Sequence, residues 1–107
     1  MTGNEYQARA ARTINLKLSG YETEMHALHG MAAELGEIHE HYQKAYQGHD
    51  FNEAKIEDEA GDLLWFLCEY LTSRGLQLDG IMQANIHKLE LRYPTGFSEW
   101  NSKNRNE

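Results

Sequence analysis

A single proline, Pro94, stands in the whole chain, so no proline interrupts a helix in the residues before it. Ahead of that proline, apolar residues recur at steps of three and four, which is the spacing of amphipathic helices. No alternation of apolar and polar residues is long enough to predict a β-strand. The sequence therefore predicts an all-α fold, a four-helix, bundle-like single domain over residues 1–107.

Turn residues divide the chain into four expected helices and a tail. The first helix should cover about 4–18 and stop at Ser19 and Gly20, with Gly20 as its C-cap. The next three should cover about 21–46, 52–74 and 78–93, the last ending before Pro94. The remainder, about 98–107, is polar and is expected to be a flexible tail, although Phe97 and Trp100 could dock back.

The third expected helix is apolar on nearly all sides. Between positions 63 and 71 only Glu69 is charged. A helix of this kind is buried on more than one face, and one short chain offers few partners for it. We therefore expect the chain to form oligomers through its long apolar helices.

Composition limits the partners and the compartment. A formal net charge of -7 and a pI near 5.3 leave no basic face for a nucleic-acid polymer or an anionic membrane. No apolar run approaches the ~20 residues of a membrane span, and residues 1–20 lack the apolar centre of a secretory signal. The one cysteine, Cys68, lies in an apolar run and suits a reducing compartment. The expectation is a cytoplasmic protein.

Two short acidic patterns stand out within the apolar helical runs. Each places two acids three residues apart, on one face of a helix, with a glycine just before the second acid. The acids are Glu34 and Glu37 in the second expected helix, and Glu59 and Asp62 in the third. If these helices pack as an antiparallel hairpin, four carboxylates converge.

Such a cluster calls for a cation. Two carboxylates 5 Å apart repel by about 3 kcal/mol at an effective dielectric of 20, and Mg²⁺ prefers oxygen ligands. Gly36 and Gly61 would let the two helices approach closely around the ion. A single acid pair would more simply be a solvated helix face. No histidine has an acid three residues before it, which disfavours a di-iron site, so we interpret most histidines as surface or packing residues.

The fourth expected helix carries a complementary polar face. Asn85, Lys88 and Arg92 lie on one side, and cationic and amide donors are what phosphate oxygens need. Alone, these residues would be an ordinary solvated face. Phe66, one turn beyond Asp62, could be a wall for a base or sugar, or part of the core.

These motifs together resemble the MazG-like nucleotide pyrophosphohydrolases. The resemblance rests on the two acidic patterns, the Leu-Leu-Trp-Phe-Leu run at 63–67 and the Asn-x-x-Lys-x-x-x-Arg-Tyr-Pro run at 85–94, and spans roughly 6–97. It implies the all-α NTP pyrophosphatase fold, assembled as a homodimer or homotetramer. It also implies Mg²⁺-dependent hydrolysis of a (d)NTP to the (d)NMP and pyrophosphate, with Mn²⁺ as a substitute ion.

Roles carry over from this resemblance position by position. The metal ligands would be Glu34, Glu37, Glu59 and Asp62; the phosphates would be bound by Asn85, Lys88 and Arg92; and Phe66 would lie near the base. Glu37 is the hypothetical base for the attacking water. One departure is Ala33, where many relatives carry a further acid.

Three functions remain open at this point. The leading one is hydrolysis of (d)NTPs for nucleotide-pool housecleaning. A phosphoribosyl-ATP pyrophosphohydrolase is the nearest alternative. A non-catalytic helical dimerisation or regulatory module is the third, although it would not need all seven polar residues.

Overall fold

Five helices make up the fold in the computed structural model, which describes residues 1–105. They are α1 (Gly3–Ala11), α2 (Gly20–Tyr46), α3 (Glu53–Ser73), α4 (Leu78–Arg92) and α5 (Glu99–Lys103). No strand occurs among the described residues, so the all-α prediction is confirmed.

The boundary between the first two helices differs from the expectation. α1 ends at Ala11, and turns follow up to Ser19. Ser19 is the N-cap of α2 and not the stop of the helix before it: its side chain accepts the N–H of Glu22, and the Glu22 carboxylate accepts the N–H of Ser19. This reciprocal capping box satisfies two backbone donors at the helix start, so Ser19 and Gly20 begin a helix.

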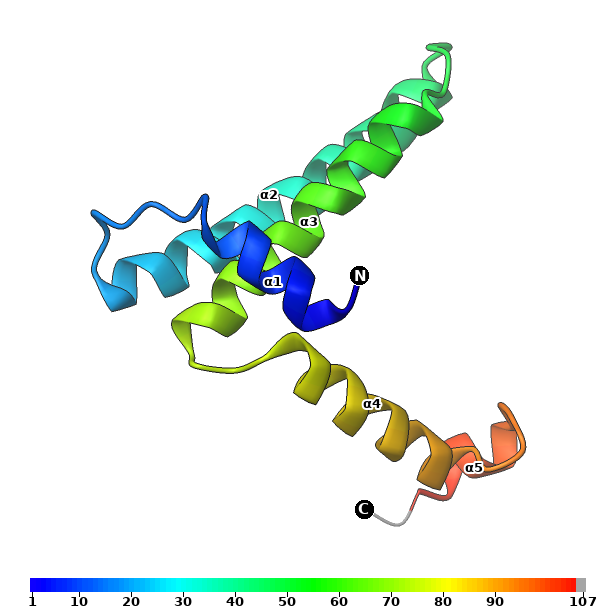
Figure 1. Cartoon of the computed structure of the whole chain (residues 1–107). Helices are drawn as coiled ribbons and strands as arrows, with labels where there is room; N and C mark the ends of the chain where they lie inside the picture. Colours follow the sequence, from blue (N-terminus) through cyan, green and yellow to red (C-terminus); the bar gives the residue numbers. More distant parts are fainter. Residues whose placement is uncertain (106–107) are drawn as a thin grey trace.

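Helices α2 and α3 form an antiparallel hairpin, joined by a turn in which Gly48 has a φ of 92° (Figure 1). The two helices are in close contact at Gly30, where an added Cβ would lie 2.2 Å from ring atoms of Phe66. The expectation that Gly36 and Gly61 allow the close approach is wrong. A Cβ on either would meet nothing within 4 Å, because both positions face away from the contact between the helices.

Helix α1 fixes the direction of α4 through side-chain hydrogen bonds. Gln77, the N-cap of α4, gives no side-chain cap. Side chains of α1 instead accept from the first backbone N–H groups of α4: Oε1 of Gln7 from the Leu78 N–H at 2.7 Å, and Oδ1 of Asn4 from the Asp79 N–H at 2.9 Å. Gln7 also donates to the Leu76 carbonyl at 2.9 Å, so α4 starts at a fixed point and leaves the hairpin at an angle (Figure 1).

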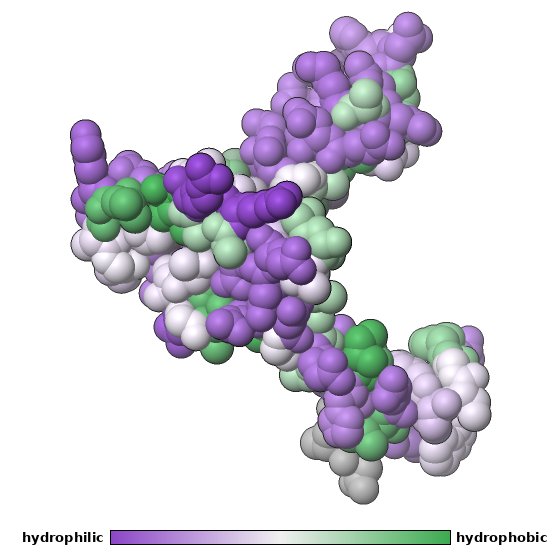
Figure 2. Space-filling view, in the orientation of Figure 1, coloured by the Kyte–Doolittle hydropathy of each residue, from purple (hydrophilic) through white to green (hydrophobic). Residues whose placement is uncertain are grey.

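A single chain therefore does not close into a four-helix bundle. The radius of gyration is 17.4 Å, whereas a compact domain of this length would have about 13 Å. The buried apolar residues are few, and an apolar row on α4 is left open, which Figure 2 shows as green patches on the lower arm. This row consists of Ile81, Met82, Ile86 and Leu89, which are 39–52% exposed.

The region after Pro94 contains α5, begun by the N-cap Ser98, where the sequence led us to expect a flexible tail. Phe97 and Trp100 do not dock on the core: they are 76% and 70% exposed, and Phe97 contacts Tyr93 with ring centroids 5.5 Å apart. Residues 106–107, the end of the expected tail, lie outside the described part of the chain.

None of the helices within residues 1–105 has the length and apolar character needed to cross a membrane.

The Gly30 contact can be tested against a matched glycine on the same helix. Gly30→Ala should lower the free energy of unfolding by about 1–3 kcal/mol, because the methyl group would overlap the root of the Phe66 ring as well as its edge. Gly36→Ala should raise it by about 1 kcal/mol, because alanine favours the helix and meets open space. Chemical denaturation at equal protein concentrations measures both, and equal effects of the two substitutions would contradict this packing.

Candidate active site

The two acidic patterns face each other across the hairpin. Glu34 and Glu37 lie on α2, and Glu59 and Asp62 lie on α3. Two contacts between the helices bracket them: Gly30 against Phe66 on one side, and His41 against Glu59 on the other. The antiparallel register set by these contacts brings the four acids into one stretch of the hairpin.

The acids influence one another electrostatically. The pKa of Glu34 is raised above its ordinary value, first by burial and then by the negative charges of Glu37 and Asp62. A hydrogen-bonding contact with Glu37 and the charge of Glu59 raise it further. All three other acids therefore act on Glu34 in the same direction, toward a higher pKa.

Two carboxylate oxygens in this cluster have no hydrogen-bond partner. Oε2 of Glu34 and Oε2 of Glu59 are both shielded from solvent and unbonded. His41 donates from Nε2 to Oε1 of Glu59 at 3.0 Å; Oε2 lies as close, but without hydrogen-bond geometry. Buried, unbonded carboxylate oxygens are costly unless they meet a cation, so these residues fit a hard divalent ion.

The cluster is not arranged as a finished coordination shell. No three acidic, histidine or cysteine side chains within the described residues surround one point closely enough to hold an ion as they stand. Glu37 and Asp62 are exposed, whereas Glu34 and Glu59 are partly buried. The side chains of Glu37 and Asp62 would have to turn toward those of Glu34 and Glu59 to complete a site. Because Glu37 and Asp62 are exposed, a substrate could approach the cluster from their side.

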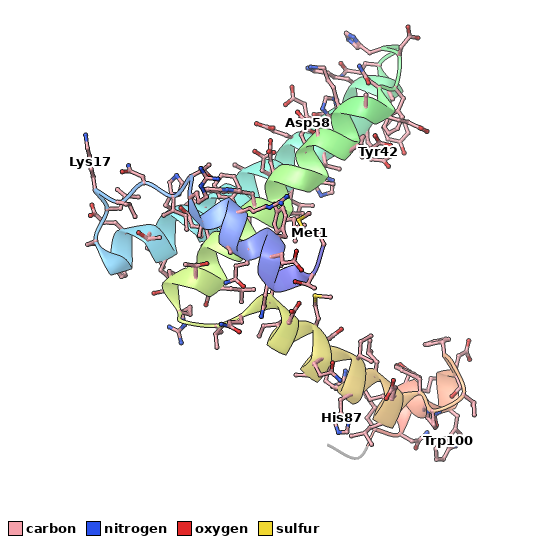
Figure 3. The ribbon with its side chains drawn as sticks, in the orientation of Figure 1. Met1, Lys17, Tyr42, Asp58, His87 and Trp100 are labelled. Atoms are coloured by element: carbon pink, nitrogen blue, oxygen red, sulfur yellow. The ribbon has the colours of Figure 1, made fainter. Side chains whose placement is uncertain are left out.

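The expected phosphate-binding residues lie on the other arm of the molecule. Lys88 and Arg92 line a pocket of about 320 Å³ between α4 and α5, and Asn85 is exposed on α4 outside this pocket. Figure 3 places Tyr42 and Asp58 on the hairpin arm, and His87 and Trp100 on the α4–α5 arm. One chain therefore does not bring these three residues to the acids.

Sequence reasoning missed part of each half of the site. The other residues that line the pocket beside Lys88 and Arg92 are Leu91, Pro94, Asn101, Asn104 and Arg105. The only sequence signal for them was the number of asparagines in the tail. We interpret most histidines as surface or packing residues, but Nε2 of His41 lies 3.0 Å from Oε1 of Glu59, a proposed metal ligand. Its position four residues after Glu37, on the same helix face, was the available signal.

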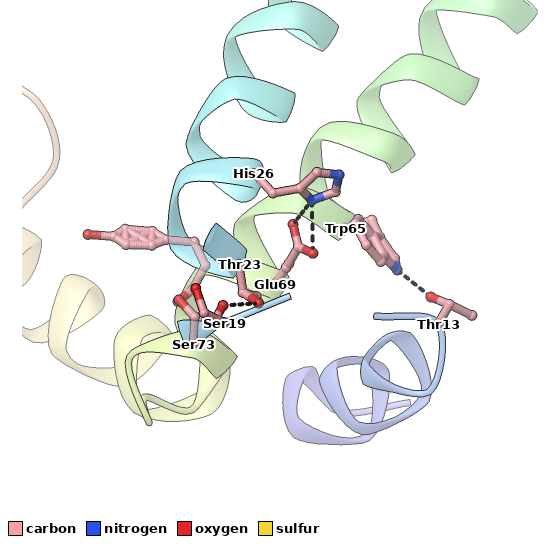
Figure 4. A network of polar contacts seen from close by, with 8 residues as sticks. Thr13, Ser19, Thr23, His26, Trp65, Glu69 and Ser73 are labelled. Atoms are coloured by element: carbon pink, nitrogen blue, oxygen red, sulfur yellow. Dashed lines mark hydrogen bonds and ion pairs between the residues drawn. The ribbon is translucent and has the colours of Figure 1, made fainter. Parts of the chain in front are cut away.

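Phe66 belongs to the contact between α2 and α3. Its ring lies against Gly30 and packs edge-on against Trp65, whose Nε1 donates to Thr13 at 2.8 Å (Figure 4). Next to it, Nδ1 of His26 binds both oxygens of the fully buried Glu69, at 2.8 and 3.0 Å (Figure 4). This pair explains how an acid is tolerated in the apolar run of α3.

The raised pKa of Glu34 predicts a stability change of definite sign. Folded Glu34 holds its proton to higher pH than unfolded Glu34, so stability falls as pH rises through the ordinary glutamate range, and the loss is complete above the raised pKa. In chelator at pH 7, Glu34→Gln should therefore raise the melting temperature, and the gain should shrink as pH is lowered to 4.

Glu40 on the same helix is the matched control. A hydrogen bond from Lys44 at 2.9 Å, followed by the Lys44 charge, lowers the pKa of Glu40, so Glu40→Gln should leave stability unchanged or lower it at pH 7. A lower melting temperature for Glu34→Gln at pH 7 would contradict the electrostatic description.

Comparison with known proteins identifies the family. The MazG nucleotide pyrophosphohydrolase domain matches residues 22–97, which include both acidic patterns and all of α4. Neither the comparison with curated proteins nor the comparison with solved structures gives a match. The matched stretch covers most of the chain, and it carries the phosphoanhydride-cleaving activity of its family. The chain therefore belongs to the MazG family of nucleotide pyrophosphohydrolases.

Proposed function

We propose that this protein is a Mg²⁺-dependent pyrophosphohydrolase that converts a (d)NTP and water to the (d)NMP and pyrophosphate, as part of nucleotide-pool housecleaning. The observation that carries the proposal is the pair of buried carboxylate oxygens without hydrogen bonds, on Glu34 and Glu59, inside a cluster of four acids. A cluster of this kind is unfavourable by itself and is well suited to divalent cations that also bind phosphate oxygens.

The four acids would have different roles in this reaction. Glu34 and Glu59 would hold Mg²⁺, or Mn²⁺ in its place, from the buried side, and Glu37 and Asp62 would hold it from the exposed side. When bound, the ion neutralises phosphate charge and favours departure of pyrophosphate. Glu37 is exposed and therefore able to reach solvent, so it would orient the attacking water and accept its proton. The oxygen of this water bonds to the α-phosphorus, the α–β phosphoanhydride bond breaks, and pyrophosphate leaves.

The cations on α4 would act from a second copy of the chain. Lys88 and Arg92 stabilise charge on phosphate oxygens, but they lie on the arm that points away from the acids of their own chain. The open apolar row on α4 needs a cover, and apolar residues such as Leu28, Leu35 and Leu64 are exposed along the hairpin. We therefore propose a homodimer, or a homotetramer built from it, in which α4 of one copy lies on the hairpin of the other.

The base would lie beside Phe66. The ring is only partly buried although it packs against Gly30, so part of it remains available to the substrate. Asn85 is exposed on α4 and would add an amide donor to the phosphates.

The activity is tested with a panel of nucleotides. Pyrophosphate release should be observed for one or more (d)NTPs with Mg²⁺, should persist with Mn²⁺ and should stop in chelator. Glu37→Gln should lower kcat by about 10²–10⁴-fold, the range for loss of a general base, with its melting temperature little changed. Release from phosphoribosyl-ATP alone would redirect the substrate assignment, and no release from any nucleotide would sink the proposal.

The shared site is tested by mixing subunits. Glu37→Gln and Lys88→Ala, each nearly inactive alone, should recover about a quarter of wild-type activity when co-expressed, because half of the random dimers then contain one intact site of two. Differently tagged copies allow the mixed dimer to be purified, and light scattering gives its size. A mixed dimer as inactive as its parents would place all seven residues within one chain.

A further inference from the structure

His41 lies at the edge of the acid cluster and has no role in the proposed reaction so far. It stands on α2, and its Nε2 is 3.0 Å from Oε1 of Glu59 on α3. The two side chains are only 18% and 14% exposed, so water competes little for this hydrogen bond. A carboxylate at neutral pH can only accept, and therefore Nε2 of His41 carries the proton.

This bond treats the two carboxylate oxygens unequally. Nε2 of His41 lies 3.0 Å from each oxygen of Glu59, but only the contact with Oε1 has hydrogen-bond geometry, so Oε2 is buried and accepts no hydrogen bond. The other histidine–glutamate pair of the hairpin behaves differently: Nδ1 of His26 binds both oxygens of Glu69, and neither is left over. Both oxygens of Glu69 therefore accept from the one donor of His26, whereas only one oxygen of Glu59 accepts a hydrogen bond from His41.

We infer that His41 is a positioning residue, which holds Glu59 so that Oε2 is presented to the divalent cation. The inference rests on the proposed function, because it concerns the same site. A hydrogen bond that orients a ligating carboxylate typically contributes about 10–100-fold to metal affinity. His41 would therefore determine how tightly the ion is held without touching the ion or the nucleotide.

The test measures Mn²⁺ affinity without nucleotide, from the electron paramagnetic resonance signal of the free ion. His41→Leu removes the donor and should weaken binding by about 10–100-fold. His41→Gln keeps an N–H donor at nearly the same reach and should recover most of the affinity. His39→Leu, an exposed histidine on the same helix, is the control and should bind as the wild type does.

Two outcomes would overturn the inference. Wild-type affinity in His41→Leu would mean that the bond only stabilises the hairpin, and this variant would then show a lower melting temperature alone. A glutamine variant as weak as the leucine variant, with both folded by circular dichroism, would mean that the imidazole itself is required.

The wild-type protein gives a check that needs no variant. Long-range ¹H–¹⁵N spectra at pH 8 should show the His41 proton on Nε2 both before and after Mg²⁺ is added, since the bond to Glu59 persists. Loss of that proton on Mg²⁺ addition would make His41 a direct ligand and contradict a positioning role.

These measurements separate this inference from the proposed reaction. Mn²⁺ binding that depends on His41, together with no pyrophosphate release from any nucleotide, would retain the positioning role and remove the reaction. Pyrophosphate release with Mn²⁺ affinity independent of His41 would do the opposite.

Discussion

The contact between Gly30 and Phe66 sets the geometry on which the rest of the molecule depends. An aromatic ring fits against bare backbone there, so α2 and α3 are held in one antiparallel register. That register pairs His26 with Glu69 and His41 with Glu59, and it leaves the four acids facing one another between these contacts. A slip by one turn would separate the acids and break both histidine contacts, so packing, buried polar pairs and the site are specified together.

The acid cluster is the part of the fold that works against stability. Neighbouring charges and burial raise the pKa of Glu34, and two carboxylate oxygens lack partners, although Glu69 nearby shows that this hairpin can satisfy a buried acid with a histidine. Glu59 differs from Glu69 in having one buried oxygen that accepts no hydrogen bond, and the proposed function assigns that oxygen to the divalent ion.

Local patterns predicted what is locally determined. Apolar spacing located α2, α3 and α4 to within about two residues, because helix period and breaking residues act over one or two turns. Two local predictions are wrong. Ser19 begins α2 where the sequence predicts a helix end, and the close contact between α2 and α3 lies at Gly30 and not at Gly36 or Gly61. The direction of α4 could not be predicted, because Gln7 and Asn4 set it from more than 70 residues away. The convergence of the four acids could be predicted from an antiparallel hairpin alone. The hydrogen bond between His41 and Glu59 could not, because it depends on the register of that hairpin.

A single chain leaves most of α4 unpacked because only the start of this helix is anchored. Gln7 and Asn4 hold only the first turn of α4, so its remaining turns extend past the hairpin with the apolar row exposed. The apolar row includes Ile86, and the polar face of α4 includes Asn85 and Lys88 on the same turns. Because α4 is a rigid helix, a surface that covers the apolar row also fixes the direction of the Asn85 and Lys88 side chains. In the proposed assembly one contact would have both effects, because burying the row on a second hairpin would also carry Lys88 and Arg92 toward the acids of that hairpin.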